Sequence, residues 1–335
     1  MMMADTGALQ QQQQREHPKW VEARVKYLAR NSGEGESSLS SAAYHASEAG
    51  TRDGGTHEGN YEYHNIKINN ARASPSVFDI DKQGFQLVTH PTNVQNFYCK
   101  DDDDEDFTKV YNLEIESLLL KQIPDAKSIV IFDHTKRSSS SQQRQVLHCR
   151  EPSTVIHNDY TEWSANKRLH DMLGESKASE IINGKKRYAI VNVWRPISDT
   201  ATESRNNATG SSDSNDVVEN WPLTFCDSTT LYTNIDQDIV SVKRIHKDRP
   251  GEIQMAYYNP NHCWYYFPHM KLFDEILVFK TYDSVKNDDN AIGNTVNRFT
   301  LHTSFDDPTA YTKKSGSTDE PAPRKSIETR AFVFY

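Results

Sequence analysis

From about residue 128 to the C-terminus, short apolar segments alternate with turns rich in Gly, Pro, Asn and Asp. Val, Ile, Tyr, Phe and Trp predominate in these segments, and they are the residue types that favour strands. Many short strands at close spacing predict a β-barrel or a double-sheet jelly roll. We expect strands at 128–132, 154–160, 187–196, 222–225, 239–245, 253–258, 263–267, 276–282, 298–303 and 326–334.

Two segments have the periodicity of a helix with one apolar face. In 110–123, apolar residues recur at three- and four-residue spacing, and a proline follows. The second segment, 162–174, ends in a glycine, which commonly terminates a helix. Further upstream, 78–88 predicts a hairpin that turns at 82–84. The sequence therefore predicts a mainly β fold with flanking helices.

The first sixty residues differ from the rest in composition. They contain a glutamine run, Gln10–Gln14, and a stretch rich in Ser, Gly and Glu, 32–59, with few large apolar residues. Such a segment buries too little apolar surface to offset the loss of chain entropy on folding. We therefore expect 1–60 to be a disordered polar segment, with at most a short helix at 20–28.

The remainder, 61–335, is expected to form one jelly-roll domain with polar insertions near 199–220 and 309–322. The net charge is −9 and there is no basic block, which argues against nucleic-acid partners. No segment approaches the roughly 20 apolar residues that span a bilayer. The four cysteines form no CxxC pair, so neither a zinc site nor a disulfide framework is indicated, and a cytoplasmic location is expected.

The segment 154–160 places His157 and Asp159 two residues apart. In a strand, residues i and i+2 point to the same face, so both side chains can bind one ion. The best candidate for a third ligand is His302, in the expected strand 298–303. Two histidines and one carboxylate on one side of a metal leave the other side open, which is the ligand set of non-haem Fe(II) oxygenases.

A second His-x-Asp pair, His246 and Asp248, is the alternative. Its spacing to His302 also suits a jelly-roll oxygenase. However, the pair lies in 243–249 among four basic residues, and basic side chains disfavour a bound cation. We therefore favour the upstream pair, which most of the expected strands follow.

Residues on the last expected strand are candidates for binding 2-oxoglutarate. Arg324 and Ser326 share one face of that strand. A guanidinium can form two charge-assisted hydrogen bonds with a carboxylate, and a hydroxyl can add a third. This pair therefore suits the distal carboxylate of the co-substrate, and Arg330 on the same face is the rival. Asn192 is a candidate for contacting the co-substrate or an iron-bound carboxylate.

The order His-x-Asp, His, Arg-x-Ser resembles that of Fe(II)/2-oxoglutarate-dependent dioxygenases. More closely, the chain resembles the fungal hydroxylase/desaturase group that includes a gibberellin desaturase and relatives of the cephem methoxylase accessory protein. The resemblance covers about 61–335. It is carried by 130–137, 156–159, 192–196, 222–223, 264–270, 275–284, 302–308 and 323–330.

This resemblance implies a double-stranded β-helix with Fe(II) held by His157, Asp159 and His302. It also implies 2-oxoglutarate and O2 as co-substrates. The expected reaction oxidises a C–H bond of a small molecule in secondary metabolism, by hydroxylation, desaturation or oxidative cyclisation.

The expected substrate is an amino acid or another small carboxylate. His134, Arg137 and Arg195 lie at ends of expected strands, where pocket residues commonly occur, and are the candidate substrate contacts. Two alternatives remain: a non-catalytic accessory protein on the same barrel, and a cupin-like metal enzyme that uses no 2-oxoglutarate.

Overall fold

The computed structural model describes most of the chain, with gaps. The second His-x-Asp pair, His246 and Asp248, lies outside the described residues, as do most of the two predicted insertions. The described residues are 17–30, 43–45, 60–75, 77–94, 96–98, 104–198, 217–231, 235–245, 250–285, 296–311 and 320–335.

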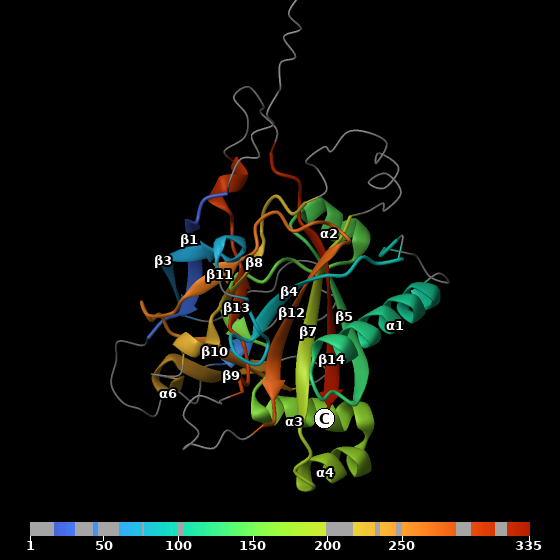
Figure 1. Cartoon of the computed structure of the whole chain (residues 1–335). Coiled ribbons are helices and arrows are strands. Elements are labelled where there is room, and N and C mark those ends of the chain that lie inside the picture. The colour runs from blue at the N-terminus through green and yellow to red at the C-terminus, as the bar shows by residue number, and fades with distance from the viewer. Residues whose placement is uncertain are drawn as a thin grey trace, which may run out of the picture.

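Two sheets face each other in the core of the molecule (Figure 1). The larger has nine strands in the order β1-β3-β11-β8-β13-β6-β10-β9-β2, and the smaller has five in the order β4-β12-β7-β14-β5. The larger sheet contains β1 (Trp20–Leu28), β2 (Ala43–His45), β3 (Tyr61–Asn70), β6 (His157–Asn158), β8 (Leu223–Cys226), β9 (Ile239–Ile245), β10 (Gly251–Ala256), β11 (Trp264–Tyr266) and β13 (His302–Ser304). The smaller contains β4 (Phe85–Thr89), β5 (Ser128–Ser138), β7 (Tyr188–Pro196), β12 (Glu275–Asp283) and β14 (Lys325–Phe334).

Helices flank this pair of sheets, as the sequence predicts. The predicted helix at 110–123 is α1 (Asp104–Gln122), which packs its apolar side on the outer face of the smaller sheet. The one at 162–174 is α3 (Glu162–Leu173), which lies with α4 (Glu175–Asn183) at one end of the sheets (Figure 1). Two short helices are α2 (Ser141–Leu147) and α6 (Ile235–Asp238). None of the described helices is long and apolar enough to cross a membrane.

The central strand β7 is buried on both faces, and its alternation decides what each side chain meets. Val191 and Val193 face outward into the apolar cluster formed with α1. Trp194 faces inward into a second cluster between the two sheets. Because strand side chains alternate, Asn192 shares the inner face with Trp194.

The prediction of a helix at 20–28 is wrong, because these residues form β1, paired antiparallel with β3. Val21, Ala23, Val25 and Tyr27 alternate with exposed residues and are buried. This period-two pattern is that of a half-buried strand, so the disorder predicted for 1–60 is also wrong for the described residues 17–30.

The predicted hairpin at 78–88 is also wrong in its first half. The carbonyl of Asp79 accepts hydrogen bonds from the backbone N–H groups of Lys82, Gln83 and Gly84, which makes a compact turn. The strand that follows, β4, pairs with β12 instead of with residues 78–81. Gly84 ends the turn with φ +96°, a backbone conformation that glycine adopts without strain.

Candidate metal centre

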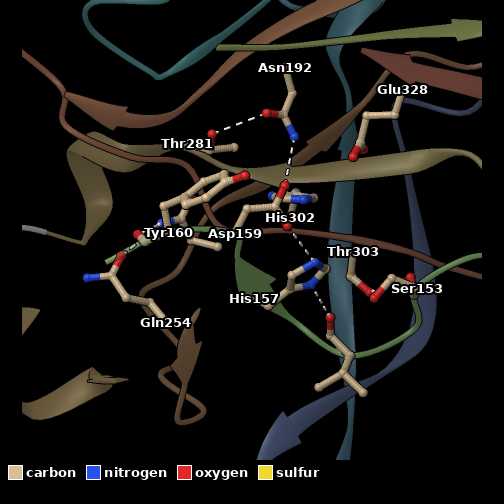
Figure 2. Close-up of polar contacts among 12 residues, drawn as sticks. Ser153, His157, Asp159, Tyr160, Asn192, Gln254, Thr281, His302, Thr303 and Glu328 are labelled. Atoms are coloured by element: carbon tan, nitrogen blue, oxygen red, sulfur yellow. Dashed lines mark hydrogen bonds and ion pairs between the residues drawn. The ribbon is translucent and has the colours of Figure 1, made fainter. Parts of the chain in front are cut away.

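The structure brings His157, Asp159 and His302 together between the two sheets (Figure 2). His157 begins β6, His302 begins β13, and the two residues are direct partners in the antiparallel ladder. One potential ligand atom from each of the three side chains lies within 4.8 Å of the others. His157 Nε2 and Asp159 Oδ1 are 3.5 Å apart. We call these three residues the triad.

Both imidazoles of the triad are oriented by a backbone carbonyl of their own segment. His157 Nδ1 lies 2.8 Å from the carbonyl oxygen of Val155, and His302 Nδ1 lies 3.0 Å from that of Thr300. A carbonyl oxygen only accepts, so each Nδ1 carries a proton and Nε2 is the ring nitrogen left for a metal. Burial, aided by the neighbouring His157, lowers the pKa of His302 to about 3, which keeps this imidazole neutral. Histidines anchored through Nδ1 in this way are typical metal ligands.

The Asp159 carboxylate is held through one of its two oxygens. Asn192 Nδ2 donates to Oδ2 at 2.8 Å, and Arg330 Nε donates to the same oxygen at 3.0 Å. Thr281 Oγ1 lies 3.2 Å from Asn192 Oδ1, which orients the amide (Figure 2). Burial opposes ionisation, but the Arg330 guanidinium holds the pKa of Asp159 well below its usual value. The carboxylate is therefore charged, and Oδ1 faces His157.

These contacts change the expected role of Arg330. Besides Asp159, its guanidinium bonds to Asp133 at 2.6 Å, to Thr135 at 3.1 Å and to Glu328. A guanidinium engaged by three carboxylates of its own chain is not available to clasp 2-oxoglutarate. The structure thus places Arg330 against Asp159, Asp133 and Glu328, and we propose Arg324 for the clasp. Asn192 was a candidate for contacting either the co-substrate or an iron-bound carboxylate. In the structure it contacts the carboxylate of Asp159.

One cavity is lined by all three members of the triad together with Arg324 and Trp194. Arg324 is buried and lies over the Trp194 ring, with its guanidinium carbon 5.5 Å from the ring centroid. Its Nη1 donates to the carbonyl of Trp221 at 2.8 Å, whereas its Nε has no hydrogen-bond partner among the described residues. Ser326 Oγ and Trp194 Nε1 are likewise buried without a partner in the described part of the chain.

Unsatisfied buried donors next to a cation form a site for an anion, because leaving them unpaired costs about 1–3 kcal/mol each. Arg324 and Ser326 thus suit the carboxylate for which the sequence selected them. The triad offers two imidazole lone pairs and one carboxylate oxygen, which suits Fe(II). The residues present therefore fit both an iron ion and 2-oxoglutarate.

Of the three predicted substrate contacts, only Arg137 lines the cavity. His134 instead bonds to Asn112 Oδ1 on α1 and to Thr329 Oγ1 on β14, each at 2.9 Å. Arg195 is buried under the same helix, and its guanidinium bonds to the Tyr111 hydroxyl and to backbone carbonyls. His134 and Arg195 therefore lie outside this cavity, because a position near a strand end does not reveal which face of the sheet a side chain occupies.

Sequence reasoning missed five residues that line the cavity: Ser153, Trp194, Leu223, Thr303 and Glu328. For Trp194 and Glu328, the two-residue period of strand side chains was a usable signal, because each shares a strand face with a candidate site residue. Trp194 lies two residues after Asn192, and Glu328 lies between Ser326 and Arg330 on one face of β14.

A family model described as Oxidoreductase/YMDC permease-like domain matches residues 25–204 and 214–334. The chain belongs to this family. Among the proteins similar to this chain, hydroxylase/desaturase efuI of Hormonema carpetanum is 27% identical over 297 residues. The match covers 82% of this chain and 85% of that protein. Hydroxylase/desaturase CTB9 of Cercospora beticola is 27% identical over 299 residues, covering 82% and 78%. The resemblance to fungal hydroxylase/desaturases is thereby confirmed.

A solved structure, the iron and alpha-ketoglutarate-dependent endoperoxidase NvfI, superposes on this chain with a TM-score of 0.67 at 21% sequence identity. The alignment covers 94% of this chain and 98% of that one. This likeness confirms the predicted jelly-roll oxygenase fold.

Proposed function

We propose that this protein is an Fe(II)/2-oxoglutarate-dependent oxygenase that oxidises a C–H bond of a small molecule in fungal secondary metabolism. The observation that carries the proposal is the triad, whose ligand atoms lie within 4.8 Å of one another and which lines one cavity with Arg324. Relatives named Fe(II)/2-oxoglutarate-dependent dioxygenase nvfI and alpha-ketoglutarate-dependent dioxygenase tstK support the same chemistry.

In this proposal His157, Asp159 and His302 hold Fe(II), and Arg324 with Ser326 holds the distal carboxylate of 2-oxoglutarate. Fe(II), 2-oxoglutarate and O2 supply the oxidising power, with succinate and CO2 as by-products. The protein supplies fixed ligands: the carbonyls of Val155 and Thr300 orient the imidazoles at 2.8 and 3.0 Å.

Two further groups of side chains complete the proposed site. Arg330 and Asn192 fix one oxygen of Asp159, so the other faces His157 and the metal position. Trp194 and Leu223 give the cavity apolar walls, which limit the water around the reacting groups.

The substrate in this proposal is an amino acid or another small carboxylate, oxidised by hydroxylation, desaturation or ring closure. The net charge of −9 supports a small-molecule partner over a nucleic acid, and we propose a cytoplasmic location because the cysteines show no disulfide framework. A non-catalytic accessory protein would have no need of three anchored ligands beside an anion site.

The proposal is tested by turnover. Purified protein with Fe(II), ascorbate and 2-oxoglutarate is screened against amino acids and terpenoid acids, following succinate release and the gain of one oxygen or loss of two hydrogens by mass spectrometry. We expect one compound to give both signals with the wild type and with His246→Ala, and neither with His157→Ala. Turnover that survives His157→Ala but not His246→Ala would contradict the ligand assignment.

A further inference from the structure

Arg137 lies directly across the sheet from Ser326. The two residues are partners in the antiparallel ladder between β5 and β14, and Arg137 lines the cavity that Arg324 and the triad also line. Side chains of directly opposed residues point to the same face, with Cβ atoms about 5 Å apart. Arg137 therefore lines the same cavity as Arg324, from the strand next to the one that carries Ser326.

No carboxylate of the described residues pairs with Arg137. Its Nη1 donates to the backbone carbonyl of Glu151 at 2.7 Å, which satisfies one of its five N–H groups without balancing its charge. The acid nearest in register on that face, Glu328, is bound to Arg330. The cavity therefore holds two guanidinium groups, Arg137 and Arg324, whose charge no neighbouring acid is committed to balance.

These two cations also affect each other. Burial and the neighbouring Arg137 lower the pKa of Arg324 to about 9, and Glu328 only partly counteracts this. Like charges held close in a buried site are unfavourable unless an anion lies between them. The arrangement is therefore stabilised by a ligand with a concentrated negative charge, such as a carboxylate.

We propose that Arg137 binds the distal carboxylate of 2-oxoglutarate together with Arg324 and Ser326, so that the clasp is built from two adjacent strands. This inference rests on the proposed use of 2-oxoglutarate. A carboxylate has two oxygens and about four lone-pair directions, enough for two guanidinium groups and one hydroxyl. Selectivity for a dicarboxylic 2-oxo acid over a monocarboxylic one then depends on both arginines.

The test compares two ligands that differ only in the distal carboxylate. Fe(II)-loaded protein is titrated without oxygen with 2-oxoglutarate and with 2-oxopentanoate, by calorimetry and by the visible charge-transfer band. We expect Arg137→Gln to weaken 2-oxoglutarate about tenfold to a hundredfold, the range for losing a hydrogen bond to a charged group, and to leave 2-oxopentanoate within about twofold. Unchanged 2-oxopentanoate binding also shows that the variant is folded.

Arg150→Gln is the matched control, because Arg150 forms a backbone bridge with Arg137 but does not line the cavity. It removes an equal charge nearby and is expected to change 2-oxoglutarate affinity less than about threefold. Equal losses for both 2-oxo acids in Arg137→Gln, no loss for either, or an equal loss in Arg150→Gln would overturn the inference. A wild type that binds neither 2-oxo acid would overturn the proposed function itself, and with it the inference.

Discussion

Arg330 and Asp159 form a buried ion pair in which Nε of the arginine donates to Oδ2 of the carboxylate at 3.0 Å. The two residues come from β14 and from the segment after β6, so this pair joins the smaller sheet to the larger one at the triad. It also removes one oxygen of Asp159 from the set of available ligand atoms. Arg330 is thus a positioning residue for the proposed iron ligand.

We expect Arg330→Lys to weaken Fe(II) binding about tenfold to a hundredfold, the usual effect of losing a partner that orients a metal ligand. An ammonium keeps the charge but cannot reproduce the fork that also holds Asp133 and Glu328. The measurement is anaerobic calorimetry with Fe(II). Arg324→Lys, the same change just before the same strand, is expected to leave Fe(II) affinity unaltered. Equal Fe(II) affinities in the two variants would contradict the role of Arg330.

Gly84 connects the turn before β4 to the metal centre. Its carbonyl accepts from Thr300 Oγ1 at 2.9 Å, and a Cβ at this position would lie 2.1 Å from that oxygen. Since the carbonyl of Thr300 orients His302, we expect Gly84→Ala to lower both Fe(II) affinity and the free energy of unfolding, the latter by about 2–4 kcal/mol. Calorimetry and urea unfolding measure the two quantities.

Gly174→Ala separates backbone strain from crowding. Gly174 also has a positive φ, +79°, but nothing lies within 4 Å of an added Cβ. We expect a loss of about 1–2 kcal/mol in stability and no change in Fe(II) affinity. If the two alanine variants bind Fe(II) equally well, the proposed link from Gly84 to His302 is refuted.

Arg195 is expected to contribute to stability and not to substrate binding. Its guanidinium bonds to the Tyr111 hydroxyl and to the carbonyls of His90 and Phe273, all outside the cavity. Arg195→Met leaves these buried acceptors unpaired, so we expect the free energy of unfolding to fall by about 2–4 kcal/mol. The KM for substrate of the folded variant should match that of the wild type. A raised KM with unchanged urea stability would restore the substrate role predicted from the sequence.

Lys280 is buried within β12 between two acids. Its Nζ lies 2.5 Å from Asp81 and 2.8 Å from Asp283, and the Lys280 and Asp283 side chains are 1% and 0% exposed. Lys280→Met leaves a buried carboxylate short of a partner, and we expect a loss of about 3–5 kcal/mol in urea unfolding near neutral pH. Lys186→Met, which breaks the exposed pair with Glu180, is the control and should cause no measurable change.

The ion pair between Lys280 and Asp283 also makes the free energy of unfolding depend on pH. Burial raises the pKa of Asp283, but Arg187 and Lys280 outweigh it and hold the pKa below its usual value of 3.8. Because the folded pKa lies below the unfolded one, this ionisation stabilises the protein above about pH 4 and the contribution is lost as the pH falls further. We expect Lys280→Met to lose less stability than the wild type between about pH 5 and pH 3. Equal acid-side losses would contradict the ion pair.

The period of two predicts which side chains share one face of a strand. It linked His157 to Asp159 and Arg324 to Ser326, and the ligand chemistry then selected His302. The period does not say which face of the sheet is the inner one, and the structure places His134 and Arg195 on the face toward α1. Two carboxylate partners of Arg330, Asp133 and Asp159, are far from it in the chain, so its role depends on tertiary structure.

The strand β1 shows a different limit. Its alternation of Val21, Ala23, Val25 and Tyr27 is legible in the sequence, but it stands among polar residues that carry no such pattern. The average composition of 1–60 predicts disorder and does not reveal this alternation. The alternate residues are buried because β1 pairs with β3 and packs in the core of the larger sheet.

The most direct test of the central claim is an anaerobic titration of Fe(II) and 2-oxoglutarate, read by the visible charge-transfer band. We predict one Fe(II) per chain and a band in the wild type and in His246→Ala, and no band in His157→Ala or His302→Ala. A full band in either triad variant, or its loss in His246→Ala alone, would contradict the assignment of iron to His157, Asp159 and His302.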